Sequence, residues 1–73
     1  MQNDKISKGL ELQIAYAMAQ AAAARTGAGY AAWYAVAGKF DDALRDYRAG
    51  FVESAGRAIK TAQRSAAFAE MTA

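Results

Sequence analysis

The side chains of this chain that could take part in chemistry are seven carboxylates, three serines and nine basic residues. The carboxylates are Asp4, Glu11, Asp41, Asp42, Asp46, Glu53 and Glu70. Asp42 and Asp46 stand one helical turn apart, which is the spacing that two carboxylates sharing a proton would need. Both fall on the expected solvent face of a helix, however, where nothing raises a carboxyl pKa. The pair therefore does not indicate acid–base catalysis.

Nucleophilic and metal-assisted chemistry lack their usual groups. The sequence contains no histidine to activate Ser7, Ser54 or Ser65, and no cysteine to supply a thiolate. Gly27 and Gly29 form only a short Gly-x-Gly, without the preceding strand that a phosphate loop requires. We therefore expect a protein that is not an enzyme, with no metal and no cofactor.

Five basic side chains form the one candidate binding feature among the charged residues. Arg57, Lys60 and Arg64 follow each other at i, i+3 and i+7 on one face of a predicted helix. Arg45 and Arg48 lie nearer the apolar face of the same helix. Such a ridge suits contacts to phosphate groups, as in nucleic-acid binders. Basic residues toward a helix C-terminus, after aspartates at its start, also complement the helix dipole. We favour this second interpretation because no base-reading motif accompanies the ridge, and nucleic-acid binding stays an alternative.

Alanine dominates the chain that must position these residues. Twenty-one of the 73 residues are alanine, whereas the net charge is only +2 and the sequence pI about 9.2. Alanine is the strongest helix former but buries little apolar area. A single domain over residues 1–73 is also near the lower size limit for independent folding. We therefore expect a partner to complete the core.

The periodicity predicts an all-α fold of three helices, long, short and long. The first begins after Asn3, Asp4 or Ser7 and runs to Arg25, with left-handed glycines ending it in residues 26–29. The second spans residues 30–37, and Gly38-Lys39-Phe40 forms a turn. The third begins at Asp41 or Asp42 and ends near Ala69. No apolar run is long enough to cross a membrane.

The first helix carries two apolar stripes. One comprises Ile6, Leu10, Ile14, Ala17, Ala21 and Ala24, and the other comprises Leu12, Tyr16, Ala19 and Ala23. Only one stripe can face the interior of so small a domain. We expect the other, with Tyr16 and Ala19 as contact residues, to meet another chain and to form a homodimer or other homo-oligomer.

The remaining apolar faces predict the core. Tyr30, Trp33, Tyr34 and Ala37 share one face and are interpreted as core, with exposure of Trp33 or a tyrosine as a binding anchor the alternative. The buried face of the third helix comprises Leu44, Tyr47, Phe51, Ala55, Ala58, Ile59, Ala62, Ala66 and Ala69. Gly50 and Gly56 inside this helix suggest that another backbone approaches closely.

Within residues 27–60, a glycine turn is followed by an aromatic residue, an alanine, a second aromatic residue and a small residue, at Gly38, Phe40, Ala43, Tyr47 and Gly50. Ala31 and Tyr34 add a small and an aromatic residue in the segment before the turn. These positions resemble the signature places of a single tetratricopeptide-type helical hairpin. Gly27 stands where that family usually has tryptophan, and neither a closing proline nor a second copy follows. The resemblance implies peptide or protein binding.

Size and composition together favour a small inhibitor or adaptor that binds a surface of a larger bacterial protein. In overall character the chain resembles the compact proteins that phages and mobile elements use to block host machinery, including CRISPR inhibitors. A self-assembling structural protein is a further alternative. Lys5 and Lys8 before Ala17-Met18-Ala19 superficially match a signal peptide, but Glu11, Gln13 and Gln20 argue against export. We expect a cytoplasmic location.

Overall fold

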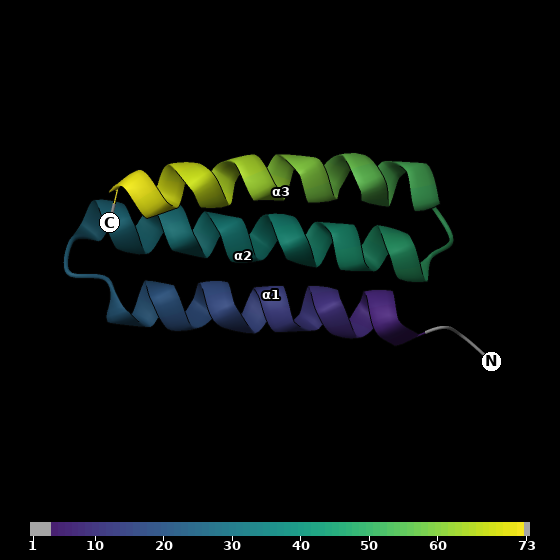
Figure 1. The fold of residues 1–73 in the computed structure, drawn as a ribbon, viewed down its shortest axis with the longest axis horizontal. Helices are drawn as coiled ribbons and strands as arrows, with labels where there is room; N and C mark the ends of the chain where they lie inside the picture. The colour runs from purple at the N-terminus through teal and green to yellow at the C-terminus, as the bar shows by residue number, and fades with distance from the viewer. Residues whose placement is uncertain (1–3, 73) are drawn as a thin grey trace.

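Three antiparallel helices make up the computed structural model, which describes residues 4–72. They are α1 (Asp4–Ala23), α2 (Gly27–Arg48) and α3 (Val52–Thr72), and residues 4–72 form no strand. Figure 1 shows α2 between α1 and α3, with the chain running from right to left in α1, back to the right in α2 and to the left again in α3. α1 and α3 each pack on α2 and hardly contact each other. The expected all-α, three-helix fold is confirmed.

The lengths of the helices differ from the long, short and long prediction. They contain 20, 22 and 21 residues, so the middle helix is the longest. α2 continues through Gly38-Lys39-Phe40, where we expected a turn. A glycine inside a helix costs about 1 kcal/mol relative to alanine, whereas burying a phenylalanine contributes about 1.5–3 kcal/mol. Phe40 is buried seven residues after Trp33, and only a continuous helix keeps both rings on one face.

The turn between α2 and α3 lies instead at Ala49, Gly50 and Phe51. Gly50 has φ +93°, the left-handed conformation that glycine adopts at low cost. The amide of Phe51 donates to the carbonyl of Asp46 at 2.9 Å, and that of Gly50 to the carbonyl of Tyr47 at 3.1 Å. This pair of bonds is a Schellman helix ending. Gly50 is therefore a helix terminator and not the site of close backbone approach that we expected.

The turn between α1 and α2 also differs from the prediction. α1 ends at Ala23 rather than Arg25, and neither Gly27 nor Gly29 has a positive φ. Both glycines belong to the first turn of α2, whose N-cap is Thr26. The Thr26 hydroxyl accepts a hydrogen bond from the Gly29 amide at 2.9 Å, satisfying one of the free amides of a helix start. A threonine cap thus replaces the glycine ending that we expected.

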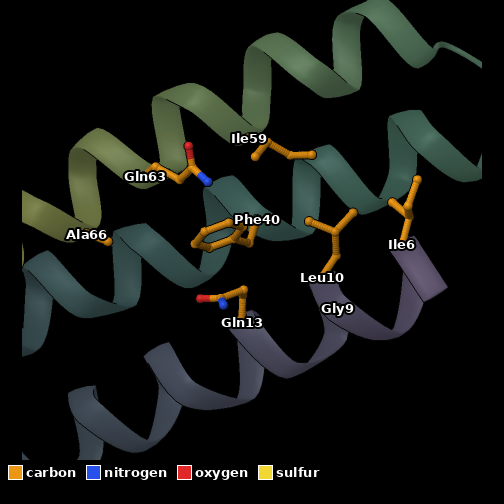
Figure 2. Close-up of a pocket in the computed structure, with 8 residues that line it drawn as sticks. All are labelled: Ile6, Gly9, Leu10, Gln13, Phe40, Ile59, Gln63 and Ala66. Carbon is orange, nitrogen blue, oxygen red and sulfur yellow. The ribbon is translucent and has the colours of Figure 1, made fainter.

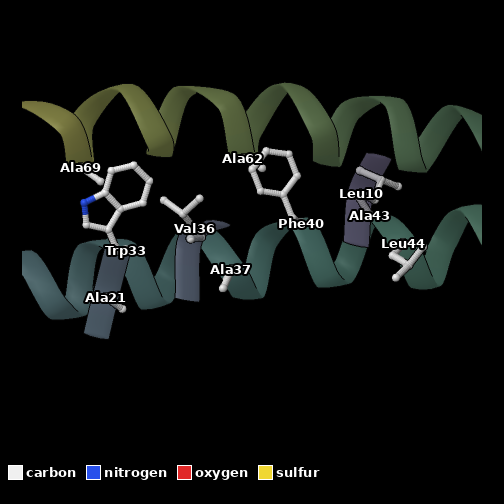
Figure 3. Packing of buried hydrophobic residues seen from close by; sticks show 11 residues of the cluster. Leu10, Ala21, Trp33, Val36, Ala37, Phe40, Ala43, Leu44, Ala62 and Ala69 are labelled. Carbon is white, nitrogen blue, oxygen red and sulfur yellow. The ribbon is translucent and has the colours of Figure 1, made fainter. Parts of the chain in front are cut away.

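The core consists of large side chains from α2 packed against small ones from its neighbours. α2 buries Trp33, Val36, Phe40 and Leu44, whereas α3 buries only alanines, at positions 55, 62 and 69. In Figure 3 the rings of Trp33 and Phe40 point from α2 toward α3, where Ala69 and Ala62 lie. On its other side α2 meets the first predicted stripe of α1, in which Leu10, Ala17 and Ala21 are buried.

Several predicted core residues are exposed. Tyr30, Tyr34 and Phe51 are each more than half exposed, because the continuous α2 turns the two tyrosines outward and Phe51 falls in the loop. Gly56 lies in α3, where a Cβ would meet no atom within 4 Å, so no backbone approaches it closely. The prediction is confirmed for Leu44, Ala55, Ala62 and Ala69, which are buried, and Tyr47, Ala58, Ile59 and Ala66 are partly buried against them.

The two glycines Gly50 and Gly56 predict opposite effects of the same substitution. Gly50→Ala places a Cβ in a left-handed conformation and should lower the free energy of unfolding by about 1–2 kcal/mol. Gly56→Ala adds a methyl group in open space and removes a helix penalty, so it should raise that free energy by about 0.5–1 kcal/mol. Urea unfolding followed by circular dichroism measures both. Equal effects of the two substitutions would contradict this assignment of the turn.

The close packing of α3 on α2 predicts that alanine size matters at position 62. Ala62 has no exposed surface and lies in the core beside Phe40. Ala62→Leu should therefore overpack the core and cost about 1–3 kcal/mol of unfolding free energy. Ala67→Leu, on the exposed side of the same helix, should change it by less than about 0.5 kcal/mol. A tolerated leucine at position 62 would show that the two helices are not in close contact.

Candidate interaction surface

A groove lies between α1 and α3. It has a volume of about 460 Å³, and α2 forms its floor. Its lining comprises Ile6, Gly9, Leu10, Gln13, Phe40, Ile59, Gln63 and Ala66. The groove exists because α1 and α3 both pack on α2 without closing on each other. No charged side chain lines it.

The lining is apolar at one end and amide-bearing in the middle. Figure 2 shows Ile6, Leu10 and Ile59 together at one end, and Gln13 and Gln63 on opposite walls beside Phe40. Gln13 and Gln63 are exposed, so their amide groups can hydrogen-bond to a ligand. Gly9 leaves its wall without a side chain, and a Cβ there would meet no atom within 4 Å. This combination suits a helix that buries apolar residues and presents one polar residue to the glutamines.

Tyr16 lies one turn beyond Gln13 on α1 and contacts Trp33 of α2. The two rings are 5.7 Å apart at 85°, an edge-to-face arrangement that aromatic rings prefer. Tyr16 remains 49% exposed, whereas Trp33 is 2% exposed. The predicted core position of Trp33 is confirmed, and its alternative role as an exposed anchor is wrong. Its indole Nε1 is buried without a hydrogen-bond partner among the described residues.

The remaining predicted contact residue of α1, Ala19, is exposed on the outer side of the helix. Leu12 and Ala23 of the same predicted stripe are exposed as well. The first stripe faces α2, except that Ile6 is 45% exposed at the mouth of the groove. α1 therefore has one covered and one uncovered apolar side, as the sequence predicted.

The five basic residues do not form one patch of free charge. Arg45 contacts Asp41 at 2.9 Å and Asp42 at 3.7 Å, and Arg48 of α2 forms an ion pair with Glu11 of α1. The hydrogen bond that Arg45 donates to Asp41, together with the negative charge of Asp41, raises the pKa of Arg45 above its ordinary value, so this side chain stays cationic. Their own carboxylate partners thus already neutralise Arg45 and Arg48.

Arg57, Lys60 and Arg64 differ because all three are exposed on α3 and make no ion pair within residues 4–72. Glu53 and Arg57 are spaced i and i+4, which favours an ion pair, but they form none in this part of the chain. These three residues alone make up the basic ridge, and they lie outside the lining of the groove.

Asp42 and Asp46, the candidate carboxylate pair, each contact a different partner. The Asp46 carboxylate accepts a hydrogen bond from the Ser54 hydroxyl at 2.6 Å, which ties the start of α3 to the end of α2. Asp42 faces Arg45 instead. Within residues 4–72, no group of three or more histidine, cysteine, aspartate or glutamate side chains is placed to hold a metal ion. No helix in the same range is long and apolar enough to cross a membrane.

The sequence does not predict the groove. Its periodicity places Ile6, Leu10 and Ile59 in the core and Phe40 in a turn, whereas all four line the groove. The recurrence of Ile6, Gly9, Gln13 and Tyr16 at three- and four-residue steps is a signal that could have marked one wall. Comparison of this chain with protein-family models, curated proteins and solved structures gave no match.

The ion pair between Glu11 and Arg48 predicts a measurable coupling between α1 and α2. Both side chains are more than half exposed, so the pair should contribute about 0.2–1 kcal/mol. A double-mutant cycle on Glu11→Gln and Arg48→Gln should give a coupling energy in this range that shrinks in about 1 M salt, roughly a sevenfold rise over physiological ionic strength. The same cycle on Glu11 and Arg64 should give none. Equal coupling in both cycles would contradict the assigned pairing.

Proposed function

We propose that this chain is a non-catalytic protein–protein interaction module, an inhibitor or adaptor that binds a larger bacterial protein. The groove between α1 and α3 is the surface that it uses, and the ligand is an amphipathic helix of the partner. The observation that carries the proposal is the uncharged groove over Phe40, with Ile6 and Ile59 at its apolar end. Helices bind in such grooves by inserting apolar residues at i, i+3, i+4 and i+7.

The arrangement of the helices supports a helical ligand. Three antiparallel helices in which the outer two hardly contact each other leave the place of a fourth helix open. The glycine and alanine in the walls, Gly9 and Ala66, allow a bound backbone to approach closely. Gln13 and Gln63 supply amide groups that favour one polar residue at the centre of the ligand helix and thereby select its register.

The uncharged lining also distinguishes this ligand from nucleic acid. Nucleic acid would have to bind the separate basic ridge, because Arg45 and Arg48 are already paired. The three cations of the ridge neutralise at most about three phosphates, so binding at the ridge would be weak, with a salt slope near −2.7 at about 0.9 per phosphate. The alternative of a self-assembling structural protein predicts instead that copies of this chain fill the groove.

The proposal is tested by photo-crosslinking at positions inside and outside the groove. A photoreactive residue at Gln13 or Gln63 should give a 1:1 adduct with the same bacterial protein. The same residue at exposed Ala35 of α2, which does not line the groove, should give none. With the purified partner, Ile6→Glu should raise the dissociation constant at least tenfold because it buries a charge in the apolar end.

Phe68→Glu is the matched control, because Phe68 is an exposed apolar residue that lies outside the groove. It should leave the dissociation constant unchanged within about twofold. Adducts of equal yield at all three positions, adducts only between copies of this chain, or retention of nucleic acid in place of a protein would overturn the proposal.

A further inference from the structure

Gly38 is a glycine that the packing of the helices does not require. It lies inside α2, where glycine is less favourable than alanine. Its φ is not positive, and an added Cβ would meet no atom within 4 Å. Neither a turn nor a close contact within residues 4–72 therefore explains it. Glycine is also used where a ligand must approach a backbone closely, and Gly38 lines a pocket.

The pocket around Gly38 lies between α1 and α2 and has a volume of about 340 Å³. Its lining comprises Ile14 and Met18 of α1 and Tyr34, Ala37, Gly38 and Asp41 of α2. None of these residues lines the groove between α1 and α3. The lining therefore combines apolar side chains with one aromatic ring and one carboxylate, and it contains no basic side chain.

The Tyr34 ring turns one face toward this pocket. Tyr30 stacks on Tyr34 from the preceding turn, with the ring centroids 5.8 Å apart and the planes at 11°. Tyr34 lines the pocket but Tyr30 does not, so the pocket lies on the side of Tyr34 away from Tyr30. The next turn of α2 on that side has Gly38, which carries no side chain to cover the ring. The face of an aromatic ring is electronegative and attracts cations.

Asp41 supplies the negative charge of the pocket. Its Oδ2 atom accepts a hydrogen bond from Arg45 at 2.9 Å, whereas its Oδ1 atom has no partner within residues 4–72. Arg45 also contacts Asp42, so two carboxylates share one guanidinium and one negative charge remains. Asp41 stands seven residues after Tyr34, which is about 10.5 Å along the helix axis. A cation above Gly38 thus lies between the ring and the carboxylate.

The ring, the carboxylate and the apolar wall together fit an alkylammonium group. An ammonium group donates hydrogen bonds, for which Asp41 Oδ1 is an acceptor, and the alkyl stem packs on Ile14 and Met18. Lysine carries one such charge on a four-carbon stem. Arginine binds carboxylates best through both oxygens, and Arg45 already contacts one of them. A polyamine would require more than the one carboxylate that lines the pocket.

We propose that this pocket binds the ammonium group of a lysine side chain from another protein. The ammonium group lies above Gly38, between Tyr34 and Asp41, and its stem lies against α1. A cation on one exposed ring and one exposed carboxylate binds weakly, so a single lysine has a dissociation constant in the millimolar range. The pocket and the groove share no residue, and each proposal can therefore fail without the other.

An NMR titration of the full chain with Nα-acetyl-lysine amide, at constant ionic strength, tests the binding. The signals of the Gly38 amide and the Tyr34 ring should shift and approach saturation by about 50 mM. n-Butylammonium represents a free amine and should bind no more tightly, and n-butanol represents the apolar part and should not bind. Binding of n-butanol with equal affinity, or of n-butylammonium without the lysine derivative, would overturn the proposal. Shifts of similar size at Glu53 and Glu70 would do so as well.

Two pairs of matched variants test the assigned residues. Asp41→Asn should raise the dissociation constant about three- to fivefold. Asp42→Asn removes the same charge from a carboxylate that contacts Arg45 but does not line the pocket, and it should change the constant by less than about 1.5-fold. Equal effects of these two substitutions would contradict the site.

Gly38→Leu fills the pocket and should raise the dissociation constant at least about tenfold, without lowering the urea midpoint, because leucine is the better helix former. Gly56→Leu makes the same change in α3, where the position is equally open but lies outside the pocket, and should leave binding unchanged. Unchanged binding in Gly38→Leu would show that the ligand does not lie above this glycine.

Discussion

The packing of large side chains of α2 against alanines of its neighbours is the constraint on which the other features depend. Trp33 and Phe40 project from the middle helix, and α3 meets them with buried Ala62 and Ala69. Such pairing of large with small residues brings helices close together and fills the space between them. It also means that only the middle helix has bulk on two sides. The outer helices therefore pack on α2 and have little with which to hold each other.

The two open surfaces follow from this distribution of bulk. Gly9 of α1 and Ala66 of α3 supply no large side chain that could help to close the walls over Phe40, and the groove remains. On the outer side of α1 no other helix packs, and Leu12 and a row of alanines are exposed to water. Both surfaces are thus consequences of the alanine content, although they differ in shape: one is a groove and the other a single helix face.

The sequence predicted the helical class and most of the covered faces, but not where α2 ends. Propensity alone favours a break at Gly38, because glycine is unfavourable in a helix. The burial of Phe40 outweighs that cost, and burial depends on packing that a local pattern does not contain. Gly50 lies at the real turn because two backbone hydrogen bonds and the Asp46–Ser54 contact hold the chain there. The sequence therefore predicts a turn at Gly38 and a helix interior at Gly50, whereas the structure has Gly38 inside α2 and the turn at Gly50.

The candidate site was harder to predict for a related reason. Helical periodicity reveals faces of one helix, and it identified the two sides of α1 correctly. A groove requires the relative placement of two helices that are distant in sequence, here Gln13 on α1 and Gln63 on α3. Ion pairs likewise include local and distant ones: Arg45 and Asp41 are an i, i+4 pair, whereas the pair of Arg48 with Glu11 joins α2 to α1. The faces of single helices therefore do not predict which charged side chains lack an ion-pair partner.

The thin core links binding to stability in this protein. A domain of this size has an unfolding free energy of about 4–11 kcal/mol, at about 0.05–0.15 kcal/mol per residue. A ligand that binds only the folded chain adds about 2.7 kcal/mol at a concentration one hundred times its dissociation constant. A helix bound over Phe40 would thus contribute a substantial share of the total, and by the same linkage anything that loosens α1 from α2 weakens the groove. Because Leu10 packs in the core and also lines the groove, folding and the proposed recognition of a helix depend on the same residue.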